Sequence, residues 1–175
     1  MFPPLPNRKR HPDYAAREGG EDRKELMNLS QFCRSELVNF SLESTTKKEV
    51  IREMVKLAAQ SELVLDEEKL YQDTMEREKL LSTGIGFGVA FPHARTEAVK
   101  GLVIAFGRSD AGIDFDALDG AFVHMLFLVA VPKHELTTHI TVIAQLSLIL
   151  KEPVNREKLM NAVFPQEVID LLNTV

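Results

Sequence analysis

The stretch Gly84–Arg95 reads GIGFGVAFPHAR and joins a glycine-rich loop to an apolar run that ends at Pro92 and His93. Glycines alternate with larger residues at its start, so the chain can turn tightly there. The apolar run 89–92 predicts a short strand. A histidine at the end of a strand is held by rigid backbone yet reaches solvent. This placement suits a nucleophile or a ligand better than a core residue.

Helical patterns flank this stretch on both sides. Apolar residues recur at helical spacing over 45–60, where Ser44 or Thr45 is the expected cap, and Asp66 is the expected cap of a helix over 67–80. After the stretch, a helix over 136–151 is predicted to bury its apolar stripe. Two short helices follow, one capped by Asn155 and one opened by Pro165. The stripe comprises Leu136, Ile140, Ile143, Leu146 and Leu150, and the short helices cover 155–163 and 165–172.

Further strands are predicted over 37–40, 102–106 and 124–131. The last of these is almost wholly apolar, which is typical of a strand in a sheet covered on both faces. Helices therefore precede, interrupt and follow the strands. The pattern predicts an α/β fold, a layered α/β/α domain with a mixed central sheet of about four to five strands flanked by helices.

The chain has the size and composition of one globular domain, with 175 residues, 45% hydrophobic and 27% charged. Residues 1–27 are rich in proline and charge, which predicts a disordered N-terminal extension before a domain over 28–175. No apolar run approaches the ~20 residues that span a bilayer, so direct membrane insertion is not expected. A single cysteine, Cys33, and no secretory signal indicate a cytoplasmic protein. The net charge of −5 argues against nucleic-acid binding.

Neither a metal site nor a nucleotide site fits this chain. His134 and His139 would lie about 140° apart around a helix, and His93 has no carboxylate or cysteine near it in sequence. The glycine loop lacks a Walker lysine and precedes a strand instead of opening a helix. We therefore expect no metal and no cofactor. The remaining histidines are assigned to the extension (His11) and to a partly buried structural position (His124), and His134 to a solvated turn.

A nucleophilic histidine fits the stretch better. Imidazole is neutral near pH 7, so it can attack an electrophile without first losing a proton. A phosphoryl group leaves nitrogen readily, which suits reversible transfer. Such a site needs donors for the negative oxygens, and arginine supplies a forked pair of them.

Four segments in order resemble the type-2 enzyme IIA domain of the bacterial phosphotransferase system, whose members include the fructose, mannitol and nitrogen-regulatory forms. Residues 88–95 (GVAFPHAR) are similar to its active-site segment, and 75–79 (MEREK) to its arginine-bearing helix end. The likeness continues at 126–132 and at 138–140, and it covers roughly residues 28–175.

The resemblance implies roles for three residues. His93 would accept the phosphoryl group, His139 would donate a hydrogen bond near it, and Arg77 would approach its oxygens. Without the resemblance, Arg77 reads as a solvated helix residue and His139 as part of an apolar stripe. Arg95 is a weaker candidate that also reads as a solvated cation.

The resemblance also implies partners. The phosphate donor would be the phosphohistidine protein HPr or its nitrogen-branch paralogue. Phosphate could pass to enzyme IIB and IIC permease subunits in sugar transport, or its presence could switch binding to regulatory target proteins. A non-catalytic regulatory binding module of the same fold stays open as the alternative function.

Overall fold

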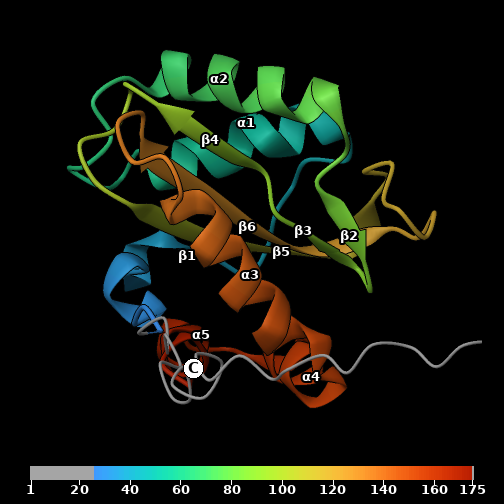
Figure 1. Cartoon of the computed structure of the whole chain (residues 1–175). Coiled ribbons are helices and arrows are strands. Elements are labelled where there is room, and N and C mark those ends of the chain that lie inside the picture. The colour runs from blue at the N-terminus through green and yellow to red at the C-terminus, as the bar shows by residue number, and fades with distance from the viewer. Residues whose placement is uncertain (1–25, 175) are drawn as a thin grey trace, which may run out of the picture.

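The computed structural model describes residues 26–174. Two helices, α1 (Lys47–Ala58) and α2 (Glu67–Leu80), cover one face of a central sheet. Three more cover the other face, and Figure 1 shows the resulting layers: α3 (Thr138–Lys151), α4 (Pro153–Asn161) and α5 (Pro165–Leu172). The predicted α/β/α layering is confirmed. The extension predicted over 1–27 lies outside the described residues except for its last two.

The sheet has six strands, of which five run in the order β1-β5-β6-β3-β2, while β4 also pairs with β6. β1 is parallel to β5, β5 is antiparallel to β6, and β3 and β4 are parallel to β6, so the sheet is mixed as predicted. The strands are β1 (Val38–Asn39), β2 (Gly84–Gly86), β3 (Val89–Ala90), β4 (His93–Thr96), β5 (Val103–Ile113) and β6 (Val123–Pro132).

The buried apolar residues form two clusters, one on each face of the sheet, and strand β6 contributes side chains to both. Met125 and Phe127 pack toward α3 and α5, whereas Leu126 and Leu128 pack toward α1 and α2. Successive side chains of a strand point to opposite faces, so a strand covered on both sides needs apolar residues at nearly every position. The apolar run that predicted a covered sheet is therefore the central strand of the fold.

The stretch Gly84–Arg95 contributes three strands instead of one. Gly86, Phe87 and Gly88 all have positive φ, and they turn β2 back onto β3 as a hairpin. The predicted strand over 89–92 ends early at Ala90, and β4 begins at His93. Pro92 lies at the break, where its missing N–H cannot continue a ladder.

Helix boundaries follow the local sequence with two corrections. Asp66 caps α2 by accepting from the Lys69 N–H, and Pro165 is the first residue of α5, both as predicted. α1 is capped one residue later than expected, by Thr46. α4 begins at Pro153, and the Asn155 amide instead donates to the Ile149 carbonyl.

The buried stripe of α3 was predicted wrongly in part. Leu136 precedes the helix and Ile140 lies in its first turn, and both are exposed. The helix presents a neighbouring face to the sheet, because this sequence is apolar on more than one face and packing selects between them. The buried residues are Val142, Gln145, Leu146, Ile149 and Leu150. Among the residues that the structure describes, no helix is long and apolar enough to cross a membrane.

Candidate active site

His93 is the first residue of β4, which lies between α2 and α3 (Figure 1). The sequence placed it at the end of a strand, and the structure places it at the start of the next one. Its side chain is buried, with 9% of the residue exposed. Backbone pairing of His93 with Val129 of β6 holds it in the sheet, so the ring has a rigid base.

Both ring nitrogens of His93 have partners. Nδ1 lies 2.8 Å from the Phe91 carbonyl oxygen, and Nε2 lies 3.0 Å from Nε of Arg77, which is 16 residues away. A carbonyl can only accept and a guanidinium can only donate. These contacts therefore assign the proton to Nδ1 and leave the Nε2 lone pair directed at Arg77.

The surroundings keep this imidazole neutral. Burial lowers the pKa of His93 below its usual 6.5, and the nearby Arg77 and His139 lower it further. The hydrogen bond to Phe91 and the charge of Glu78 act in the opposite direction without reversing the shift. A neutral ring with an unprotonated Nε2 is the nucleophilic form of histidine.

Arg77 lies half-buried in the last turn of α2. Its Nη1 donates to the Leu81 carbonyl just beyond the helix, at 3.1 Å. This second contact fixes the guanidinium plane while Nε faces His93. The residue that looked like a solvated helix cation is thus directed at the buried histidine.

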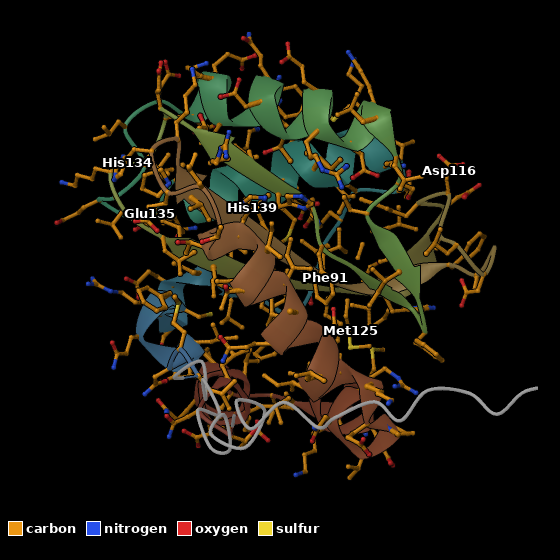
Figure 2. All side chains as sticks on the ribbon, viewed as in Figure 1. Phe91, Asp116, Met125, His134, Glu135 and His139 are labelled. Carbon is orange, nitrogen blue, oxygen red and sulfur yellow. The ribbon has the colours of Figure 1, made fainter. Side chains whose placement is uncertain are left out.

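His139 stacks on His93 from the other side of the site. It is in the first turn of α3, and the two rings are 6.0 Å apart between centroids with 23° between their planes. Figure 2 labels it at the end of α3 next to β4, with His134 and Glu135 in the preceding turn. Its Nδ1 is buried and has no hydrogen-bond partner among the described residues. Burial lowers the pKa of His139, and Arg95 and Arg77 lower it further.

These residues share one open pocket of about 470 Å³. Arg95 is two residues after His93 on the same strand, so both side chains project to the same face. It is exposed, whereas two lysines at the rim form ion pairs with carboxylates at 3.2 Å, Lys69 with Asp73 and Lys133 with Glu97. The lining residues include His93, His139, Arg77, Arg95, Lys69 and Lys133, with Asp73, Glu76 and Glu97. Cations slightly outnumber carboxylates, which favours an anionic group at its centre.

The two other histidines that the structure describes lie where the sequence predicted. His124 is partly buried and its Nδ1 is 2.9 Å from the Ser109 carbonyl, whereas His134 is exposed. His11 lies outside the described residues. Among residues 26–174, no three histidine, cysteine or acidic side chains come together as metal ligands. Guanidinium groups beside both site histidines would also repel a cation.

Two features of the site were missed by sequence reasoning. The Phe91 carbonyl that orients His93 is a backbone group, which no residue pattern reveals. Glu78 is also buried beside Arg77, although a glutamate near a helix end normally reads as solvated. Its only sequence signal is its position next to that arginine.

Comparisons with known proteins cover almost all of the described residues. The family model for "Phosphoenolpyruvate-dependent sugar phosphotransferase system, EIIA 2" matches residues 31–175. A fructose-specific EIIA component of Haloferax volcanii is 35% identical over 86% of this chain and 98% of its own length. A nitrogen regulatory protein of Pseudomonas aeruginosa is 34% identical over 73% of this chain and 86% of its own length. The chain spans only 23% of a Bacillus subtilis fructose-specific EIIABC component, to which it is 33% identical over 84% of its own length.

Solved structures agree in fold. The nitrogen regulatory protein IIA-Ntr of Neisseria meningitidis superimposes with a TM-score of 0.76 at 31% identity, over 82% of this chain and 98% of that one. A IIA mannitol protein of Escherichia coli, in complex with phosphorylated IIB, gives a TM-score of 0.68 at 26% identity, over 79% of this chain and 95% of that one. The likeness thus extends to sugar-specific and nitrogen-regulatory proteins alike.

Proposed function

This chain belongs to the EIIA 2 family of the phosphoenolpyruvate-dependent sugar phosphotransferase system, and we propose that within it His93 carries the phosphoryl group. Members of the family are phosphotransfer components. The observation that carries the proposal is the state of His93: a buried neutral imidazole whose Nδ1 is tied to Phe91 and whose Nε2 faces a guanidinium.

The transfer step follows from this geometry. The Nε2 lone pair attacks the phosphorus of a donor phosphohistidine, and a new P–N bond forms as the donor's P–N bond breaks. The electron pair of the broken bond stays on the donor nitrogen. No proton has to move, because Nδ1 keeps its hydrogen and its bond to the Phe91 carbonyl. The step therefore needs neither a general base nor a cofactor.

Arg77 and His139 would stabilise the transferred group. Once Nε2 is bonded to phosphorus it can no longer accept from Arg77, so the guanidinium turns to the phosphoryl oxygens next to it. His139 lies across the same pocket, its Nδ1 has no partner within residues 26–174, and it supplies a further donor. Donors held in place before the reaction stabilise developing charge without reorganisation. Arg95 adds positive charge at the rim.

The proposed donor is HPr or its nitrogen-branch paralogue, acting in the cytoplasm. An enzyme IIB domain is the proposed acceptor, supported by the solved complex of a IIA mannitol protein with phosphorylated IIB. A IIC subunit would complete a permease. A regulatory role, in which phosphorylation switches binding to target proteins, is supported by the likeness to nitrogen regulatory proteins.

Phosphorylation assays test the assignment. The protein is incubated with enzyme I, HPr or its paralogue, and phosphoenolpyruvate. We expect acid-labile, base-stable phosphate that disappears in His93→Ala. His124→Ala is the matched control, because His124 is partly buried and its Nδ1 is also bonded to a backbone carbonyl. Label that survives in His93→Ala refutes the assignment, and no label with either donor favours the non-catalytic binding module.

A further inference from the structure

Glu78 occupies an unfavourable position for a carboxylate. Only 5% of the residue is exposed, and it lies in the last turn of α2. Burying a charge is costly unless it is paired, and the negative end of the helix dipole repels a carboxylate there. Local rules of this kind are broken most often at functional sites. The question is what this carboxylate holds.

Its contacts join three separate segments. Oε1 accepts from Lys47 Nζ of α1 at 2.7 Å and from the Thr83 backbone N–H at 3.0 Å. Oε2 accepts from the Thr83 hydroxyl at 2.5 Å. The carboxylate is thus paired with a cation and bonded by both oxygens. It connects the start of α1, the end of α2 and the residue that leads into β2.

One chain of hydrogen bonds connects the Glu78–Thr83 contacts to Nδ1 of His93. The carbonyl of Thr83 accepts from the Phe91 N–H at 3.0 Å. The carbonyl of Phe91 then accepts from Nδ1 of His93 at 2.8 Å. Glu78 holds Thr83 at two atoms, so it also fixes the backbone segment that selects the His93 tautomer.

A second chain of contacts connects Glu78 to Nε2 of the same ring. Arg77 is adjacent to Glu78, and its Nη1 binds the Leu81 carbonyl. Leu81 begins the short loop 81–83 between α2 and β2, which the Glu78–Thr83 contacts tie to the helix end. The guanidinium held by this loop places its Nε 3.0 Å from Nε2 of His93. Both hydrogen bonds of the imidazole therefore depend on one buried carboxylate.

We propose that Glu78 is a positioning residue for phosphoryl transfer, which holds the two groups that fix the tautomer and orientation of His93. The inference rests on the proposed function of His93. Glu78 touches neither the ring nor the place of the phosphoryl group, and it acts through Thr83, Phe91 and Arg77. Its charge also opposes the lowering of the His93 pKa by burial, which keeps the lone pair basic.

Glu78→Ala tests the proposal against a matched control. Glu68→Ala removes another ion pair between α1 and α2, the exposed contact of Glu68 with Arg52, which has no path to His93. With phosphorylated HPr as donor, we expect Glu78→Ala to lower kcat about 10- to 100-fold with KM within about twofold, since small displacements of a reacting group have effects of this size. Glu68→Ala should change kcat less than about twofold.

The tautomer of His93 is the second measurement. The ¹⁵N shifts of the ring in the unphosphorylated protein distinguish a proton on Nδ1 from one on Nε2. We expect one tautomer in the wild type and in Glu68→Ala, and a mixture in Glu78→Ala. A folded Glu78→Ala protein with wild-type tautomer and kcat overturns the proposal.

A milder variant covers the case in which Glu78→Ala does not fold. Thr83→Val keeps the side-chain shape and the backbone N–H but removes the hydroxyl that donates to Glu78. We expect kcat to fall about 3- to 10-fold. The melting temperature should fall as well, because the buried carboxylate loses one of its donors, so kcat is measured well below it. A kcat equal to the wild-type value would overturn the proposal. The tautomer measurement needs no donor, so it tests the positioning of His93 even if no donor phosphorylates the wild type.

Discussion

Replacing Arg77 by lysine separates the charge of the guanidinium from its shape. Arg77 uses Nε for His93 and Nη1 for the Leu81 carbonyl at the same time. Lysine carries all its donors on a single nitrogen and cannot place them at both positions of the guanidinium fork. Arg77→Lys therefore retains a cation in the pocket but loses the fork that we assign to the phosphoryl oxygens. Arg77→Met removes the charge as well.

The magnitude follows from the hydrogen bond that lysine cannot replace. A hydrogen bond to a charged group contributes about 1.5–3 kcal/mol. Without one such bond in the transition state, at about 1.4 kcal/mol for each tenfold change, the transfer rate falls about 10- to 150-fold. Arg77→Met should lower it further. The bond from the guanidinium to the Leu81 carbonyl also disappears, and as a charge-assisted bond at an exposed contact it contributes at most about 1.5–3 kcal/mol of folding stability.

Rapid-quench phosphorylation with phosphorylated HPr measures the rate, and NMR titration of His93 measures its pKa. The positive charge of Arg77 lowers the pKa of His93, so Arg77→Met should raise this pKa while Arg77→Lys leaves it nearly unchanged. Arg34→Lys, at an exposed position, is the control for the substitution itself. Wild-type transfer kinetics in Arg77→Lys would refute a bidentate role. A pKa that does not rise in Arg77→Met would refute the electrostatic argument.

Further predictions concern the second histidine, acid stability and the glycine hairpin. His139→Ala should slow transfer about tenfold, the effect of removing one donor, while the melting temperature changes little because its Nδ1 has no partner among the described residues; equal losses of both would indicate a structural role. The folded-state pKa values of both site histidines lie below 6.5, so the unfolded chain binds more protons than the folded protein as the pH falls through 6.5. The free energy of unfolding therefore decreases, by up to about 1.4 kcal/mol per pH unit for each histidine. Urea unfolding at pH 5.5 and 7.5 should show a smaller decrease for His93→Ala, and an unchanged slope would contradict the shift. Gly84→Ala would place a Cβ 2.9 Å from the Ala117 Cα and should lower the free energy of unfolding in urea by about 1–3 kcal/mol. The control Gly101→Ala, whose Cβ has a Leu63 methyl at 3.3 Å as its nearest contact, should lower it less. A larger loss for Gly101→Ala than for Gly84→Ala would refute the steric explanation.

Local sequence signals predicted the elements that depend on neighbouring residues. The Asp66 cap, the Pro165 helix start and the apolar run of β6 each report an interaction within a few residues or a burial pattern of period two. The errors arose where packing selects between local options. α3 buries a face that includes Val142 and Ile149 instead of the predicted one. The expected strand over 89–92 ends at Ala90, and β4, which was not predicted, begins after Pro92.

The candidate site also combines a local sequence motif with residues that only packing brings together. The Pro92–His93 motif is local and could be found in the sequence. The roles of Arg77 and His139 were only implied by a family resemblance, because nothing in their own neighbourhoods distinguishes them from a surface cation and a stripe residue. Their placement around one imidazole depends on how α2 and α3 pack beside β4.

The sequence by itself determined the layered fold, its family and the histidine on which the proposed chemistry is centred, because periodic burial and a contiguous motif are encoded by adjacent residues. Only the tertiary structure decided the tautomer and pKa direction of His93, which depend on a backbone carbonyl, burial and charges from other elements. It also decided the role of Glu78, whose partners Lys47 and Thr83 meet only when α1, α2 and β2 are packed together. Contacts between segments distant in sequence require the intervening chain to close into a loop, so no short stretch of sequence encodes them.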